Sequence, residues 1–234
     1  MPSKAELTIA GYYDGIFRFY GTVNRLLTLG LDVWWRRRAA KTLKELRPGA
    51  ETALDVCAGT GDFSIILCRT YGGTLKVTGA DLSSTMLSAA RQKTAEIKFV
   101  EAEAKNLPFA DASFDLVAIS FAARNLNTNR ESMIEALRES RRVLKAGGAF
   151  MNLETTRPKN PAAGLIFRLY VRTAIGVLNL LRPESRAQYS FLRTTILNFY
   201  HPEEFTALLL EAGFKTAGYK ILCPGAVAVH LAVK

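Results

Sequence analysis

The stretch that decides the fold is LDVCAGTGDFS, residues 54–64. Apolar residues lead into Gly59-Thr60-Gly61, and a segment with helical spacing follows, so we predict a strand, a glycine turn and a helix. Such a turn lets a ligand approach the backbone closely. Two carboxylates frame it, Asp55 before and Asp62 after. The two acids restrict which ligand fits there.

Composition and charge indicate a folded domain. The chain has 234 residues, 49% hydrophobic and 22% charged, which suits one globular domain. The N-terminal stretch lacks an apolar run with a cleavage site, and the three cysteines share no metal-ligand spacing, so we expect a cytoplasmic protein without a metal. The net charge of +10 suits an anionic membrane, an acidic substrate or simply a solvated surface. No RNA-binding motif occurs, so no nucleic acid partner is expected.

Strand-like and helix-like segments alternate through the centre of the chain. The predicted strands are 52–58, 75–83, 97–104, 114–123 and 149–155. The predicted helices are 62–72, 84–95, 129–148 and 201–214, and a β-hairpin is expected at the end. This alternation predicts βαβ units in the α/β class. We therefore expect a Rossmann-like, mostly parallel, seven-stranded sheet with helices on both faces.

Two helical segments lie outside this alternation. Residues 12–46 are aromatic and basic and precede the first strand, so we assign 1–47 as an N-terminal helical cap. Residues 157–200 are long, apolar and basic, and we expect two or three helices there, inserted as a lid after the fifth strand. We predict a single domain over residues 1–234.

Two cofactors compete for the glycine turn. NAD places its pyrophosphate at the helix N-terminus after a G-x-G-x-x-G/A turn, but Asp62 in the first helical turn repels a pyrophosphate. S-adenosylmethionine has no phosphate and carries an ammonium and a sulfonium, so Asp55 becomes attractive. Asp81, at the end of the second strand, is placed to accept hydrogen bonds from both ribose hydroxyls. The order of these acids favours S-adenosylmethionine.

Further cofactor contacts are expected beyond the carboxyl ends of the strands. We expect Glu103 to take the adenine amino group and Ala104 to offer its backbone. For Leu82 and Met86, a place in the helix core is an equally good interpretation. The full set of predicted cofactor residues is Asp55, Gly59, Thr60, Gly61, Asp81, Leu82, Met86, Glu103, Ala104 and Ser120.

Several motifs together resemble one family. LDVCAGTGD, GADLSSTML, NLPFADASFD, ISFAARNL and RVLKAGG, in this order, resemble the ubiquinone/menaquinone biosynthesis C-methyltransferases of the UbiE/MenG type. The likeness extends to YYDG…VNRLLTLGLDVWWRR, LETTRP and PGAVAVH, so it covers nearly the whole chain. The sequence departs from the family at Ala122 or Ala123, where Gly is usual, and at Glu103, where Asn or Asp is usual. Residues 157–200 match poorly in detail.

The resemblance implies a class I S-adenosylmethionine-dependent methyltransferase. Its reaction would transfer a methyl group to a ring carbon of a reduced prenylated quinol such as demethylmenaquinol. The alternative is a methyltransferase of the same class acting on another small-molecule, isoprenoid or RNA acceptor.

Carbon methylation needs a neighbouring phenol to lose its proton. We expect Arg124 to hold the phenolate or a water that takes the proton, with Asn125 orienting the quinol oxygen; a surface salt bridge is the alternative for Arg124. His201 and His230 are expected to be structural. Candidates for acceptor contact, or else for helix caps and interhelical hydrogen bonds, are Tyr13, Asp14, Asn24 and Glu154.

Two segments suit a prenyl tail and a membrane. VWWRRR at 33–38 sets two Trp beside three Arg, a pairing common at membrane interfaces. The apolar run from 165 to 182 contains Arg168, Arg172 and Arg182, which we expect to make it too short to span a bilayer. We expect this helix to lie on the inner face of an anionic membrane or to cover the site as a buried lid. A homodimer is a candidate assembly.

Overall fold

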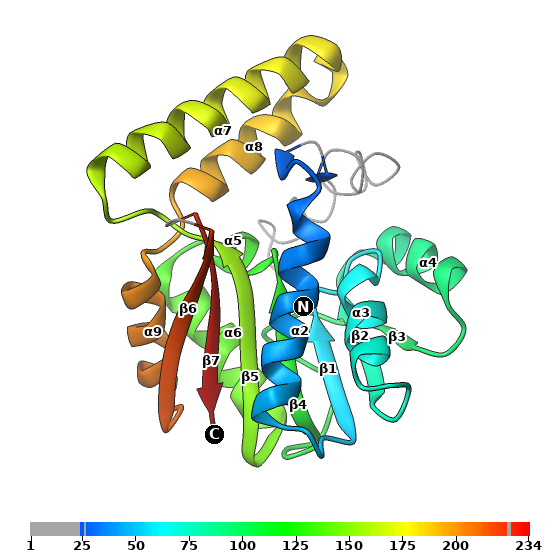
Figure 1. Ribbon diagram of the computed structural model, residues 1–234. Helices are drawn as coiled ribbons and strands as arrows, with labels where there is room; N and C mark the ends of the chain where they lie inside the picture. The colour runs from blue at the N-terminus through cyan, green and yellow to red at the C-terminus, as the bar shows by residue number, and fades with distance from the viewer. Residues whose placement is uncertain (1–23, 26, 224–225) are drawn as a thin grey trace.

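A seven-stranded sheet forms the centre of the described part of the computed structural model, which comprises residues 24, 25, 27–223 and 226–234 (Figure 1). The strands are β1 Thr52–Val56, β2 Lys76–Asp81, β3 Lys98–Glu101, β4 Phe114–Ser120, β5 Leu144–Thr155, β6 Thr216–Cys223 and β7 Val227–Val233. Their order is β3-β2-β1-β4-β5-β7-β6, with β1 to β5 parallel and β7 antiparallel to both neighbours. The predicted Rossmann-like, mostly parallel sheet with a terminal hairpin is confirmed.

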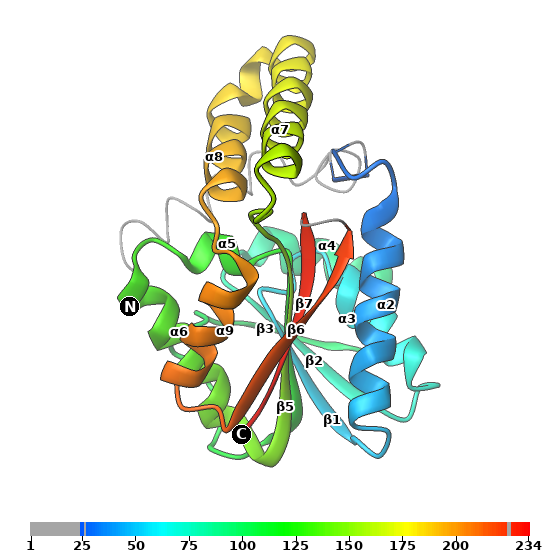
Figure 2. The same cartoon turned by 60° about the vertical axis from the view of Figure 1, so that its left-hand side comes forward.

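Helices cover both faces of this sheet (Figure 2). One face carries α2 Leu31–Leu46, α3 Asp62–Thr70 and α4 Ser84–Lys93. The other carries α5 Ala123–Leu126, α6 Arg130–Val143 and α9 Pro202–Glu211. Each face has its own apolar core, with Leu43 and Leu67 fully buried on the first and Met133 and Phe205 on the second. Burying each such side chain stabilises the fold by about 1.5–3 kcal/mol.

The segment after β5 forms a pair of helices above the carboxyl ends of the strands (Figure 2). It consists of α7 Pro161–Leu181, a short 3-10 turn Pro183–Ser185 and α8 Arg186–Leu197. The pair has a small apolar core of its own, formed by Val171, Ile175, Leu178, Tyr189, Leu192 and Ile196. The two or three helices expected in 157–200 are therefore present.

The helix predicted at 129–148 is too long. α6 ends at Val143, and Leu144 already begins β5. Gly147 has φ 70°, which disfavours a residue with a side chain. A Cβ on Gly148 would come within 3.0 Å of the Asp115 carbonyl oxygen. The glycine pair therefore permits an irregular, close start of β5 against β4, whereas we predicted a helix stop.

Several predicted strands extend too far at their carboxyl ends. β1 ends at Val56, because Cys57 turns into the left-handed region at φ 57°. β4 ends at Ser120 for the same reason, since Phe121 has φ 55°. Both turns direct the following residues to the carboxyl edge of the sheet.

α7 contradicts our expectation that its arginines make it too short to span a bilayer. It is 21 residues long with a mean hydropathy of 1.4 in its most apolar window, and 22% of that window is buried. By length and composition alone it is able to cross a membrane. Arg168 and Arg172 lie within the helix without interrupting it, and Arg182 lies beyond its last residue. In this structure α7 packs along α8.

Candidate functional site

The glycine turn after β1 is braced by Asp81 from the neighbouring strand. The Asp81 carboxylate accepts hydrogen bonds from the backbone N–H groups of Gly59 at 2.8 Å and Ser83 at 2.9 Å. Gly61 has φ 75°, and a Cβ there would lie 2.9 Å from the Phe99 ring. The turn is therefore fixed in one conformation with its backbone exposed to a ligand.

A small polar cavity of about 40 Å³ lies beside this turn. Its walls include Arg36, Asp55, Gly59, Thr60 and Ser120. Within the described residues, Asp55 Oδ1 and the Ser120 hydroxyl oxygen are buried without a hydrogen-bond partner. Burying unpaired polar groups is costly. The cavity is therefore prepared for a polar ligand.

The Asp55 carboxyl is poised between its neutral and ionised forms. Its side chain is buried, and this burial raises its pKa to about 7, against the opposing effects of a 2.6 Å hydrogen bond from Ser64 Oγ and the charge of Arg36. A cationic ligand group placed against Oδ1 would favour the ionised form.

A larger apolar cavity of about 230 Å³ lies next to the polar one. α2, α7 and α8 form its sides, and the carboxyl edge of the sheet forms its floor. Most of its lining is aromatic or aliphatic, from residues such as Trp35, Phe121, Phe167, Val171 and Leu192. A few convergent polar groups in an apolar pocket are typical of a small-molecule site.

Arg36 belongs to the walls of both cavities. It is buried, its Nη1 donates to Asp32 Oδ2 at 2.5 Å, and its guanidinium lies 5.2 Å from the centroid of the Phe121 ring. The predicted interfacial role of VWWRRR is thus wrong for Trp35 and Arg36, which α2 packs against the sheet; only Trp34, Arg37 and Arg38 are exposed. The helical spacing of the buried residues was the available signal, since positions three and four apart share one face. These positions are Asp32, Trp35, Arg36, Ala39, Ala40 and Leu43.

Arg124 also lines the apolar cavity. Its Nη1 lies 3.0 Å from Glu154 Oε1 and 2.5 Å from the Phe121 carbonyl oxygen, and its backbone N–H donates to Glu154 Oε2 at 3.3 Å. Both side chains are buried. The surface salt bridge that we considered for Arg124 is therefore a buried pair. Glu154 lies behind Arg124 and holds the guanidinium against the cavity.

Asn24 also lines the apolar cavity, while Asn125 lies in α5 and its backbone N–H donates to the Ala122 carbonyl at 2.9 Å. Tyr13 and Asp14 lie outside the described residues.

The predicted adenine contacts are more dispersed. Met86 is a buried residue of α4, and its backbone N–H donates to Ser83 Oγ at 3.1 Å. Leu82 is half-buried, and Ala104 is buried in the core. Glu103 lies in an isolated bridge with Asn106 and near Lys105, 3.9 Å away. None of these residues lines the two cavities as the described part of the chain forms them.

Both histidines have structural partners. The His201 Nδ1 lies 2.7 Å from the Arg157 carbonyl at the start of α9. The His230 Nε2 lies 3.0 Å from the Pro202 carbonyl, and burial lowers the pKa of His230 to about 4, so it is neutral. Neither lines either cavity.

Comparison with known proteins agrees with this geometry. Residues 1–234 match the ubiE/COQ5 methyltransferase family. The chain is similar to demethylmenaquinone methyltransferases of Staphylococcus aureus strains JH9 and Newman, each 36% identical over 225 residues, which are 95% of this chain and 91% of the relative.

Solved structures show the same fold. A Thermotoga maritima SAM-dependent methyltransferase, described as a possible histamine N-methyltransferase, has a TM-score of 0.66 at 19% identity and covers 96% of this chain and 98% of its own. Human N-acetylserotonin methyltransferase in complex with SAM has a TM-score of 0.63 at 17% identity, covering 100% of this chain and 60% of its own.

Proposed function

Since the chain belongs to the ubiE/COQ5 methyltransferase family, we propose that it transfers the methyl group of S-adenosylmethionine to a ring carbon of a reduced, prenylated quinol. It is an S-adenosylmethionine-dependent methyltransferase of quinone biosynthesis. The proposed acceptor, demethylmenaquinol or a close analogue, is supported by the similarity of the chain to demethylmenaquinone methyltransferases. The observation that carries the proposal is the pair of adjoining cavities, one polar and one apolar, that share Arg36.

The polar cavity suits the amino-acid end of S-adenosylmethionine. Asp55 Oδ1, buried without a partner in the described structure, matches an ammonium. Arg36 in the same wall matches a carboxylate, and Asp81 at the turn matches the ribose hydroxyls. A zwitterion needs both charges, and the cavity offers both. When bound, the sulfonium supplies an activated methyl group.

The apolar cavity suits a quinol ring and the first part of its tail. Its lining excludes water and restricts the ring to a few orientations, which accelerates a displacement that already has a good leaving group. Arg124, paired with Glu154, supplies a positive charge on the wall of this cavity, where the proposed ring oxygen would bind. We assign Arg124 to hold that oxygen; Asn125, predicted to orient it, is not among the described residues that line the two cavities.

Quinone profiling by mass spectrometry tests this function. Cells without the protein should accumulate a quinone that lacks one ring methyl group, and the purified enzyme should methylate the corresponding quinol. Unchanged quinones, together with methyl transfer to a soluble compound or RNA, would instead establish the alternative acceptor class.

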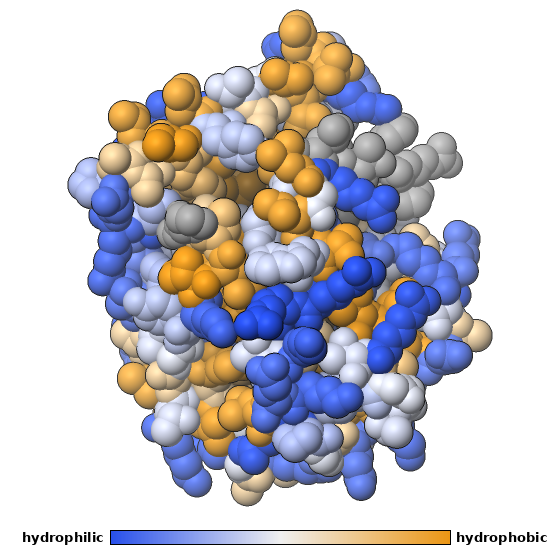
Figure 3. Space-filling view, viewed as in Figure 1, coloured by the Kyte–Doolittle hydropathy of each residue, from blue (hydrophilic) through white to orange (hydrophobic). Residues whose placement is uncertain are grey.

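We also propose that the enzyme works at the surface of an anionic membrane, with α7 as its contact. Hydrophobic side chains gather on the part of the molecule that α7 and α8 form (Figure 3). Six of them on α7 are between 51% and 79% exposed: Leu165, Ile166, Leu169, Val177, Leu180 and Leu181. Arg168 and Arg172 are exposed on the same helix, and the chain carries a net charge of +10. Apolar and cationic groups together match anionic lipid.

Co-sedimentation with vesicles of neutral or anionic lipid tests this contact. The wild type should bind anionic vesicles at low salt, and the double variant Ile166→Glu/Leu169→Glu should not. Leu210→Glu on α9, where the leucine is 48% exposed, is a matched control and should bind as the wild type does. A wild type that ignores anionic vesicles contradicts the proposal. A double variant with a reduced molar mass in solution would assign the same face to a homodimer.

A further inference from the structure

Methylation of a ring carbon needs a group that accepts the proton of the acceptor's phenol, a requirement that rests on the proposed function. Among the described residues that line the apolar cavity, one carries a carboxylate, Asp32 of α2. Both histidines lie elsewhere. Glu154 lies behind Arg124, and its Oε1 also accepts hydrogen bonds from the backbone N–H and hydroxyl of Thr155.

Asp32 is held firmly on the cavity wall. Its Oδ2 accepts from Arg36 Nη1 at 2.5 Å, and its Oδ1 accepts from Thr28 Oγ1 at 3.2 Å. The side chain is almost completely buried. A carboxylate has about four acceptor sites, so each oxygen keeps room for one further hydrogen bond. The carboxylate is thus positioned without being saturated.

The effect of the buried Asp32–Arg36 ion pair on stability does not explain why the pair is present. An acid in the first turn of a helix suits the helix dipole, and a pair spaced i,i+4 suits an exposed helix face. A buried ion pair, however, is often no more stable than apolar residues of the same volume. Here the pair lies beside an apolar cavity, where desolvation costs most. A role toward a bound molecule accounts for its position.

We propose that Asp32 accepts the proton of the acceptor's phenol and that Arg36 stabilises the phenolate that forms. The phenol O–H bond breaks, its proton passes to an Asp32 oxygen, and the electron pair remains with the ring. The neighbouring ring carbon then forms a bond to the methyl carbon while the carbon–sulfur bond breaks, and that bonding pair stays on sulfur. The methylated carbon loses its hydrogen as a proton, and the ring oxygen regains a proton from Asp32. One proton is released overall, and Asp32 ends ionised.

Arg36 is suited to this part because it borders both cavities. A guanidinium beside the ring oxygen favours the phenolate over the phenol. Arg124, which also lines the apolar cavity, adds a second positive charge. The wall of the apolar cavity therefore carries one proton acceptor, Asp32, and two cations, Arg36 and Arg124.

The other titratable groups on the cavity wall are unsuited to accept the proton. The Tyr170 hydroxyl of α7 donates to the Leu27 carbonyl at 2.9 Å. Burial raises the pKa of Tyr170 and of the Cys223 thiol of β6, so both remain protonated near neutral pH. Among the described residues that line this cavity, Asp32 is the group with acceptor capacity.

The variant Asp32→Asn tests the proposal because it keeps the shape of the side chain and an oxygen for Arg36. Its turnover of the quinol should fall by about 10²- to 10⁴-fold, while its affinity for S-adenosylmethionine, measured by calorimetry, should stay within about twofold of wild type. Glu45→Gln removes the same charge from an exposed position on the same helix and should keep the wild-type rate.

The pH dependence separates a proton acceptor from a packing residue. The deficit of Asp32→Asn should shrink as the pH approaches about 10, where a phenol ionises without help. Asp32→Glu, which keeps the carboxylate, should have an intermediate rate with the wild-type pH profile, and it provides the test if Asp32→Asn fails to bind the donor. An Asp32→Asn variant at the wild-type rate, or with a deficit independent of pH, overturns this role. A wild type inactive on every quinol overturns the proposed function itself, and this role with it.

Discussion

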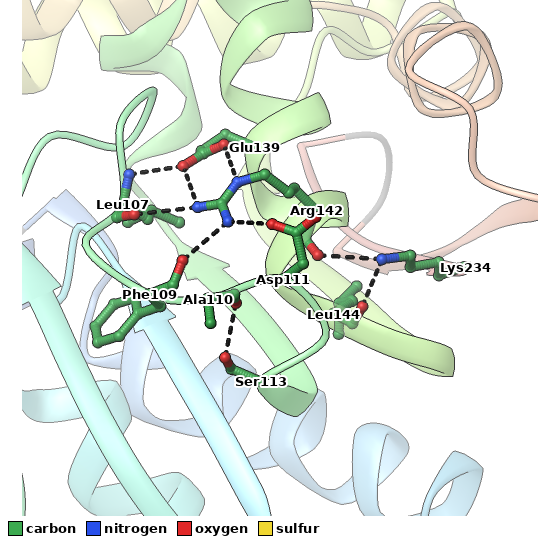
Figure 4. A network of polar contacts seen from close by, with 9 residues as sticks. All are labelled: Leu107, Phe109, Ala110, Asp111, Ser113, Glu139, Arg142, Leu144 and Lys234. Atoms are coloured by element: carbon green, nitrogen blue, oxygen red, sulfur yellow. Dashed lines mark hydrogen bonds and ion pairs between the residues drawn. The ribbon is translucent and has the colours of Figure 1, made fainter.

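Two arginines, Arg142 and Arg124, have similar partners at opposite ends of the central strands. Figure 4 shows Arg142 at the end of α6, between the helix and the loop before β4. Its guanidinium donates to both Glu139 oxygens at 2.8 Å, to Asp111 at 2.6 Å, and to two backbone carbonyls of the loop at 2.9 and 3.1 Å. These contacts engage all five of its N–H donors, and the hydrogen bonds that it donates to Glu139 raise the pKa of Arg142. All five of these hydrogen bonds join the guanidinium to other groups of the protein.

Arg124 is arranged differently. It is buried with Glu154, its side-chain contacts to Glu154 and Phe121 both run through Nη1, and it lines a cavity. Arg142 is a third exposed and lines neither of the two cavities described. An arginine–glutamate pair therefore does not by itself indicate function. Arg124 differs from Arg142 in being buried on the wall of a cavity, and this position marks it as a candidate site residue.

Removing Glu154 should have the largest effect on stability. Glu154→Ala leaves Arg124 buried without its carboxylate, and losing one partner of a buried pair costs about 3–5 kcal/mol in the free energy of unfolding. Urea denaturation followed by circular dichroism measures this. If Glu154→Ala lowers the free energy of unfolding no more than Arg142→Ala does, the Arg124–Glu154 pair is solvated. The contrast between the two arginines then no longer holds.

Arg124→Gln should reduce catalysis more than donor binding. Loss of a fixed positive charge at the developing phenolate costs about 10²- to 10³-fold in kcat, by analogy with removal of one oxyanion-hole donor. Calorimetry with S-adenosylmethionine should show an unchanged Kd. A fully active variant would remove Arg124 from the mechanism and place it with Arg142 as an anchor.

Arg142→Ala should act on stability alone. Its partners are the part-exposed loop carbonyls and carboxylates, which return to water, so we expect a loss of about 1.5–3 kcal/mol, the range for hydrogen bonds to charged groups. The rate per folded molecule should equal that of wild type. Arg142→Lys should recover part of the stability, and a specific loss of turnover in either variant would contradict the comparison.

The smallest expected effect is on the pH dependence of donor affinity. Because the pKa of Asp55 is about 7 without a ligand, its ionised fraction rises about eightfold from pH 6 to pH 7.5, and the affinity for S-adenosylmethionine should rise with it. Calorimetry at pH 6 in buffers of different ionisation enthalpy should show release of nearly one proton. Asp55→Asn should remove both effects.

The raised pKa of Asp55 has the opposite effect on the stability of the free protein, which falls as the pH rises. Its folded state holds the Asp55 proton more tightly than the unfolded chain does. The stabilisation from this proton is complete below about pH 3.8 and is lost as the pH rises through about 7. Thermal unfolding of wild type and Asp55→Asn across this range checks the sign.

The sequence predicted the polar cavity better than the apolar one for a physical reason. Asp55 and Asp81 lie at the carboxyl ends of β1 and β2, and Gly59 lies in the turn after β1. The carboxyl ends of parallel strands meet on one side of the sheet, so local order fixes their neighbourhood. Asp32 and Arg36 reach the site only because α2 packs on the sheet face and the helices after β5 cover it. That packing joins segments far apart in the chain, which no local pattern reports.

The separate core of α7 and α8 has a consequence for how this enzyme family can diversify. The six side chains of that core pack mainly on one another. Substitutions among them should therefore change the shape of the proposed acceptor cavity while leaving the two cores that support the sheet and the methyl-donor site unchanged. Acceptor specificity can thus change in evolution through substitutions in α7 and α8, without changes in the residues that bind the methyl donor.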